Sequence, residues 1–208
     1  KIPEPLLAVI ITIILGILIS SLIFGPSYVI DKFNDLKKPL IKPVTDRFGV
    51  TVAENRQPYF NEWASSFGPY FKKFAVSFWL FIIGSVFLVF SMLNIFKIRE
   101  RVVIALSYFV LLLAIIFSRY KPNSILNGEN FFSVYVVYLG GVVLFLCVFG
   151  FYYYKYYKER EFERLKSIDF GIILLLSFFV FGIISARGSV RTIMVLVPPA
   201  SIMISFLI

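Results

Sequence analysis

Six long runs of apolar residues, almost free of charge, dominate the sequence. They lie at residues 6–24, 74–96, 102–118, 131–154, 168–186 and 190–208. A helix of about 20 apolar residues crosses a hydrocarbon core of about 30 Å, and each run reaches or approaches that length. Soluble domains are about 45–50% apolar, whereas this chain is 59% hydrophobic. The runs predict an all-α, polytopic membrane protein, with about six transmembrane helices in one transmembrane domain that covers residues 1–208.

The composition excludes several kinds of chemistry. The chain has no histidine, and its single cysteine, Cys147, lies inside the fourth apolar run. Histidine-based acid–base chemistry, a thiolate metal site and a disulfide framework are therefore excluded within these residues. Any metal must be held by oxygen ligands, which favours Mg²⁺ or Mn²⁺ over zinc. The net charge of +9 indicates loops near anionic lipid, and we expect no nucleic-acid partner.

The distribution of Lys and Arg among the short loops predicts the orientation. The loops at 97–101 and 155–167 carry eight basic residues, whereas the loop at 119–130 and the turn with Arg187 and Arg191 carry four. Basic residues in short loops favour the cytoplasmic side. We therefore expect a multi-pass cell-membrane protein in which residues 25–73, the 119–130 loop and the last turn face outside.

Residues 25–73 form the longest predicted loop. Pro26 suits the first position of a helix, and apolar residues recur after it at helical spacing. This pattern predicts an amphipathic helix on the outer membrane surface, which Pro39 and Pro43 would end. A polar run, FGVTVAENRQPYFNEW, follows at residues 48–63. Its single-carboxylate motif, Thr51-Val52-Ala53-Glu54, is short, and a lone glutamate in a loop is most often a solvated surface charge.

The second notable stretch is ARGSVRTIMVLVPPA, residues 186–200. Arg187 and Arg191 are four residues apart and could share one helix face. Two guanidiniums suit a pyrophosphate, which accepts bidentate hydrogen bonds. Arginines near the end of a span also often extend to the interface without a ligand. Pro198 and Pro199 lie within the apolar segment that follows.

These two stretches resemble motifs of the catalytic subunit of oligosaccharyltransferase, especially of the archaeal type. TVAENRQP is similar to the Thr/Ser-Ile/Val-x-Glu signature of that family's fifth external loop, and VRTIMVLVPPASIM is similar to its arginine-containing apolar segment. The resemblance covers about 25 residues and implies part of a GT-C membrane fold. It implies transfer of an oligosaccharide from a polyisoprenyl (di)phosphate lipid to Asn of Asn-x-Ser/Thr in an acceptor polypeptide, on the outer side of the membrane.

The resemblance also implies roles for individual residues. Glu54 would be the catalytic glutamate and a ligand of one Mn²⁺ or Mg²⁺ ion, and Thr51 would line the acceptor-peptide site. Arg191 would bind the lipid pyrophosphate, with Arg187 as a candidate helper. The family places two spans between its glutamate and its arginine, whereas four are predicted here. Arg119 lies nearer the usual distance and is the rival for the pyrophosphate role.

Other family features are not in these residues. The Asp-x-Asp motifs and the Trp-Trp-Asp motif are missing, and the only tryptophans are Trp63 and Trp79. We therefore expect a fragment of a longer chain that is inactive alone and whose remaining metal ligands lie elsewhere. Three alternatives stay open: another GT-C transferase that uses a polyprenyl-phosphate sugar, a transporter segment, and a scaffold subunit of a membrane complex.

Overall fold

The computed structural model describes residues 4–41, 56–68, 71, 74–158 and 169–207. All regular structure in these residues is helical, and the only strand-like pairings are isolated bridges at Phe71–Phe74 and Arg119–Asn127. The predicted all-α class is confirmed for this part of the chain. The chain divides into two compact units, residues 1–41 and residues 42–208, and each is described by itself.

The first unit holds helices α1 (Glu4–Phe24) and α2 (Pro26–Ile41). They join at Gly25, whose φ of 88° suits a residue without a side chain. Helix α1 is apolar along its length, as predicted for a span, and α2 begins at Pro26 as predicted for the amphipathic helix. The helix continues past Pro39 and ends at Ile41, between the two prolines that were expected to end it. A proline so near the end of a helix removes only one backbone hydrogen bond from its last turn.

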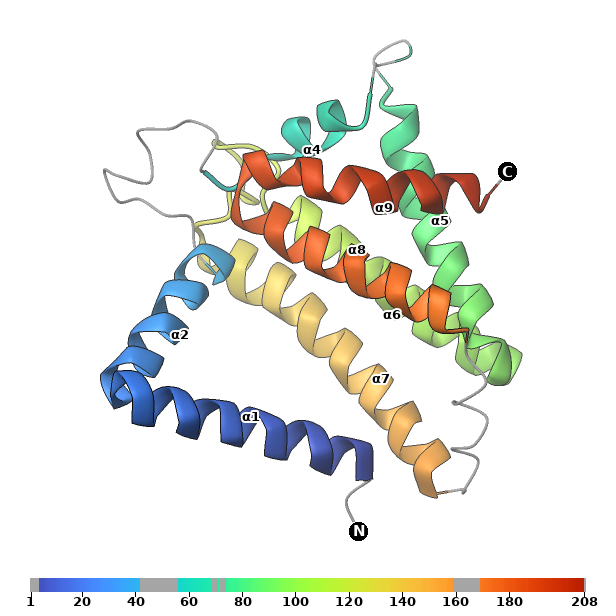
Figure 1. Cartoon of the computed structure of the whole chain (residues 1–208). Helices are drawn as coiled ribbons and strands as arrows, with labels where there is room; N and C mark the ends of the chain where they lie inside the picture. Colours follow the sequence, from blue (N-terminus) through green and yellow to red (C-terminus); the bar gives the residue numbers. More distant parts are fainter. Residues whose placement is uncertain (1–3, 42–55, 69–70, 72–73, 159–168, 208) are drawn as a thin grey trace. The chain divides into compact units, whose positions relative to one another are not determined.

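The second unit contains the remaining helices (Figure 1). In chain order they are α4 (Phe60–Ser66), α5 (Val76–Met92), the 3₁₀ turn η2 (Leu93–Ile95), α6 (Ile98–Phe117), the π-helix η3 (Phe132–Leu139), α7 (Gly140–Lys158), α8 (Phe170–Gly188), the 3₁₀ turn η5 (Val190–Thr192) and α9 (Ile193–Ser205). Helix α6 packs against α5 and α7, and α9 packs against α5 and α8.

Five helical segments of the described residues are long and apolar enough to cross a membrane. They are Leu7–Phe24, Val76–Ile95, Ile98–Phe117, Phe132–Lys158 and Phe170–Gly188. The chain is therefore a membrane protein. The sixth apolar run, at residues 190–208, contains α9, which has 13 residues. Such a helix rises only about 20 Å, less than the thickness of a hydrocarbon core. Pro198 and Pro199 lie inside it.

Small residues allow the helices of the second unit to approach closely. A Cβ atom added at Gly141 of α7 would lie 2.4 Å from the Cβ of Ala114 on α6. One added at Gly84 of α5 would lie 2.4 Å from the carbonyl oxygen of Met203 on α9. In membrane proteins, where apolar burial adds little between helices, such close backbone contact is a main source of packing energy.

The second unit carries buried charge at two ends, which we call the arginine end and the carboxylate end. The arginine end holds Arg119, just after α6, and Arg187, in the last turn of α8. The carboxylate end holds Glu100, in the first turn of α6, and Lys155, in the last turn of α7. Because Glu100 and Arg119 flank the same 20-residue helix, these ends lie on opposite sides of the bundle.

Candidate functional site

Arg187 is a buried cation that no carboxylate pairs with among the described residues. It is 1% exposed, and its guanidinium carbon lies 4.7 Å from the ring centroid of Tyr138 on the π-helix. None of its three guanidinium nitrogens has a hydrogen-bond partner in the described structure. A buried charge without a partner is costly, so this arrangement is unusual for a side chain with only a structural role.

Arg119 lies close to Arg187 and is nearly as buried, at 4% exposure. Its Nη1 donates a hydrogen bond to Oε1 of Gln57 at 3.1 Å, and its guanidinium carbon lies 4.4 Å from the ring centroid of Tyr59. Its Nε is buried without a partner. Arg119 and Arg187 are near enough for their charges to repel. We call these two residues the arginine pair.

No carboxylate neutralises the arginine pair within the described residues. The ion pairs there join Lys32 to Asp35, Arg56 to Glu62 and Lys155 to Glu100. Five of the six buried side-chain polar atoms that lack a hydrogen bond there are N–H donors of Trp63, Arg119 and Arg187. Buried donors without acceptors indicate a place for an anion that offers several oxygen atoms.

The loop after α6 fixes the position of Arg119. Its backbone forms a bridge with Asn127, and the N–H of Tyr120 donates to the carbonyl of Leu126 at 2.7 Å. Gly128 has a φ of 82°, and a Cβ added there would lie 3.0 Å from Cγ of Arg119. The aliphatic part of Arg119 therefore packs against a backbone that only glycine accommodates easily.

The segment Arg56–Phe60, which belongs to the predicted loop at residues 25–73, is bonded to this site. The N–H of Phe60 donates to the carbonyl of Arg119 at 3.1 Å, and the N–H of Val190 donates to the carbonyl of Arg56 at 2.9 Å. The segment is thus bonded both to the end of α6 and to η5, next to α8. The TVAE motif immediately precedes it in the chain.

The π-helix η3 carries Tyr138, the residue that contacts Arg187. π-Helical turns are rare and occur frequently at functional sites, because their wider turns displace side chains from regular α-helical positions. Ser133 at the start of η3 accepts a hydrogen bond from the N–H of Gly128 at 2.9 Å and donates one to the carbonyl of Ser118. The π-helix is therefore bonded to the loop that holds Arg119.

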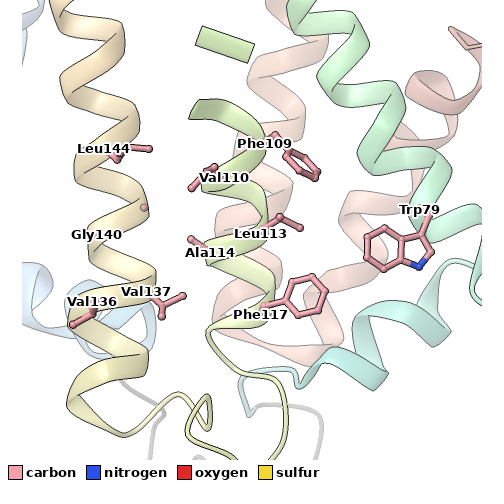
Figure 2. Close-up of a pocket in the computed structure, with 11 residues that line it drawn as sticks. Trp79, Phe109, Val110, Leu113, Ala114, Phe117, Val136, Val137, Gly140 and Leu144 are labelled. Atoms are coloured by element: carbon pink, nitrogen blue, oxygen red, sulfur yellow. The ribbon is translucent and has the colours of Figure 1, made fainter. Parts of the chain in front are cut away.

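An apolar groove of about 680 Å³ extends along α6 to Phe117, the last residue of that helix. Figure 2 shows its floor on α6, with Trp79 of α5 on one side and η3 and α7 on the other. Its lining residues are Trp79, Phe109, Val110, Leu113, Ala114, Phe117, Val136, Val137, Gly140, Gly141 and Leu144. Phe117 is two residues before Arg119, and Val137 directly precedes Tyr138. The groove is therefore lined by α6, which Arg119 follows closely, and by η3, which carries the residue that contacts Arg187.

The site residues predicted from the sequence have different outcomes in the structure. Glu54 and Thr51 lie outside the described residues. Arg119 and Arg187, the predicted rival and helper, are brought together. Arg191 is exposed on η5, and its proposed role stays a prediction. The expectation that Arg187 and Arg191 share one helix face is wrong, because α8 ends at Gly188 and the extended Ser189 separates them.

Gln57, Tyr59 and Tyr138 are site residues that the sequence did not predict. Gln57 follows the TVAE motif closely, and this proximity was the available signal. Tyr138 is one of several tyrosines in an apolar run, and nothing in its neighbourhood singles it out. For the predicted divalent cation, the described residues contain no group of three or more acidic, histidine or cysteine side chains that could hold a metal.

Comparison with known proteins adds no assignment to this geometry. No family model matches the sequence, and neither a curated protein nor a solved structure matches the chain.

Proposed function

We propose that the chain is part of a GT-C oligosaccharyltransferase and that its arginine pair binds the (di)phosphate of a polyisoprenyl-linked oligosaccharide donor. The observation that carries this proposal is the pair of buried guanidiniums, Arg119 and Arg187, without a carboxylate partner among the described residues. Phosphate oxygens accept charge-assisted, bidentate hydrogen bonds from guanidinium groups. In the proposed topology this end of the bundle faces outside.

The apolar groove supports a lipid donor rather than a soluble one. Its lining is almost entirely aliphatic and aromatic, and it extends along α6, which Arg119 follows closely, and along η3, which carries Tyr138. The chain of a polyisoprenyl lipid lying in the groove would place its phosphate end beside Arg119 and Tyr138. Apolar burial and phosphate recognition would then act on two parts of one molecule.

The proposed reaction transfers the oligosaccharide to the side-chain nitrogen of Asn in an Asn-x-Ser/Thr acceptor. Glu54 would accept a hydrogen bond from the amide N–H and would supply one oxygen ligand to Mn²⁺ or Mg²⁺, while Thr51 would contact the acceptor peptide. When bound, the cation would help to neutralise the leaving phosphate. The arginine pair stabilises the charge that develops on that phosphate as the glycosidic bond breaks. Arg191, exposed on η5, would contact the donor at the rim.

A binding experiment tests the phosphate site. The whole protein in lipid nanodiscs is titrated with undecaprenyl pyrophosphate, with inorganic pyrophosphate in a parallel series. Arg119→Gln and Arg187→Gln should each weaken binding about tenfold or more, because each removes charge-assisted hydrogen bonds worth about 1.5–3 kcal/mol. Lys121→Gln is the control, since Lys121 is an exposed cation at the same end. Equal binding by all four proteins contradicts the proposal.

The acceptor distinguishes the proposed reaction from its nearest alternative. The arginine pair and the groove would equally suit a GT-C transferase that uses another polyprenyl-phosphate sugar. With a lipid-linked oligosaccharide donor and the full-length enzyme, an Asn-x-Thr peptide should be glycosylated and a Gln-x-Thr peptide should not. Glu54→Gln should reduce the rate by two orders of magnitude or more, as is typical for loss of a group that acts in the transition state. Glycosylation of neither peptide would favour the alternative.

A further inference from the structure

The segment Arg56–Glu62 brings a carboxylate and a third cation, Arg56, near the arginine pair. Glu62 is bound by Arg56 through two hydrogen bonds, one of them 3.1 Å long between Nη1 and Oε2. The same Oε2 accepts the backbone N–H of Tyr59 at 2.7 Å. The ring of Tyr59 contacts two cations, since the guanidinium carbons of Arg56 and Arg119 lie 5.3 Å and 4.4 Å from its centroid.

The hydrogen-bond acceptor of Arg119 is neutral. Its Nη1 bonds to the side-chain amide of Gln57, which is 1% exposed. A glutamate has nearly the same shape as glutamine, so a carboxylate could occupy this position and would pair more strongly with the guanidinium. The amide therefore orients Arg119 and leaves its charge uncompensated.

We propose that Gln57 and Arg56 are positioning residues that preserve the positive charge of the arginine pair: Gln57 orients Arg119 through a neutral amide, and Arg56 holds the Glu62 carboxylate away from it. This inference rests on the proposed function, in which that charge binds a lipid (di)phosphate. A carboxylate paired with Arg119 would compete with the phosphate for the same donors. Neither Gln57 nor Arg56 needs to contact the phosphate to control its affinity.

Two substitutions of Gln57 separate charge from shape. In Gln57→Glu the side chain keeps its size and gains a negative charge, so the melting temperature without anion should rise while pyrophosphate affinity falls about tenfold or more. Gln57→Met removes the acceptor without adding charge and should weaken binding only severalfold. A purely structural role for Gln57 predicts the reverse order, with the isosteric Glu variant binding as the wild type does.

The Arg56–Glu62 pair is tested by rescue. Arg56→Met frees the Glu62 carboxylate and should weaken pyrophosphate binding more than Lys121→Met, which removes the same charge from an exposed position at this end. Adding Glu62→Gln to Arg56→Met should restore affinity. Adding Glu129→Gln should not, although Glu129 is an exposed carboxylate on the loop after Arg119 and its removal changes the net charge equally. Equal rescue by both second substitutions would mean that only overall charge matters and would overturn the inference.

The measurement is isothermal titration calorimetry of the whole protein in nanodiscs with inorganic pyrophosphate, and Arg187→Gln serves as the reference. If the wild type binds and Arg187→Gln binds about tenfold more weakly or not at all, the phosphate site stands. If Gln57→Glu and Arg56→Met then bind as the wild type does, this inference alone fails. If the wild type does not bind, or if Arg187→Gln binds equally well, the proposed phosphate site and this inference both fail.

Discussion

The two ends of the second unit differ in whether their buried charge has hydrogen-bond partners. At the carboxylate end Glu100 is 7% exposed. It accepts a hydrogen bond from Nζ of Lys155 at 2.6 Å and another from the hydroxyl of Tyr156. At the arginine end Arg187 is more buried, and within the described structure its nitrogens have no hydrogen-bond partner. The first charge is satisfied by the fold, and the second is not.

This difference is what we expect if the first charge is structural and the second is placed for a ligand, as we propose. A buried ion with its partners in place joins two helices, here α6 and α7, and has no further need of solvent or ligand. A buried cation whose donors stay unused raises the free energy of the fold, and proteins retain such costs mainly at functional sites. The comparison therefore predicts that substitutions at the two ends will change stability and binding independently.

The largest expected effect is stabilisation of the arginine end by its ligand. Inorganic pyrophosphate at about 100 times its dissociation constant should stabilise the wild type by about 2.7 kcal/mol. Arg187→Gln, which should bind at least about tenfold more weakly, should lose about half of this gain or more, whereas Glu100→Gln should keep it. Thermal unfolding in detergent, with and without pyrophosphate, measures the difference. If pyrophosphate stabilised the wild type and Arg187→Gln equally, the site would lie elsewhere.

The second effect belongs to the carboxylate end. Glu100→Gln should destabilise the protein by about 2 kcal/mol, because it breaks the charge-assisted pair between Glu100 and Lys155. The loss stays moderate because the Lys155 side chain is 34% exposed and can be hydrated. Denaturant titration in detergent measures the change, and pyrophosphate affinity should be unaltered. A change in affinity would mean that the two ends are coupled.

Much of the helical framework could be predicted from the sequence. A long apolar run is a local property of the chain, so it can be recognised without knowing which distant segments it contacts. The ends of the 102–118 and 168–186 runs fall within a few residues of those of α6 and α8. The membrane environment makes this prediction strong, since a backbone surrounded by lipid must satisfy its hydrogen bonds within each helix.

The candidate site was harder to predict, because burial depends on contacts between distant segments. Arg191 was favoured for its place at the start of an apolar run, yet the extended Ser189 puts it on an exposed turn. Arg119 meets Gln57 across 62 residues of sequence, and nothing local to either residue indicates this contact. The same holds for Glu100 and Tyr156, which are 56 residues apart.

A matched pair of tyrosine substitutions gives the third effect. Tyr156 contacts its charged neighbour through the hydroxyl, whereas Tyr138 presents its ring to Arg187. Tyr156→Phe should therefore destabilise the protein by about 1.5 kcal/mol, the lower value for a hydrogen bond to a charged group. Tyr138→Phe keeps the ring and should change stability by less than about 0.5 kcal/mol. Thermal unfolding of both variants tests this order, and equal losses would contradict it.

The smallest predicted effect is also the one whose sign is most informative. Arg187→Met replaces a buried, unpaired cation by an apolar side chain of similar length, so without anion the protein should become more stable by about 1 kcal/mol. Arg191→Met, on the exposed turn η5, is the control and should change stability by less than about 0.5 kcal/mol. Denaturant titration in phosphate-free buffer measures both. A loss of stability in Arg187→Met would show that Arg187 supports the fold as Glu100 does, and the contrast between the two ends would then disappear.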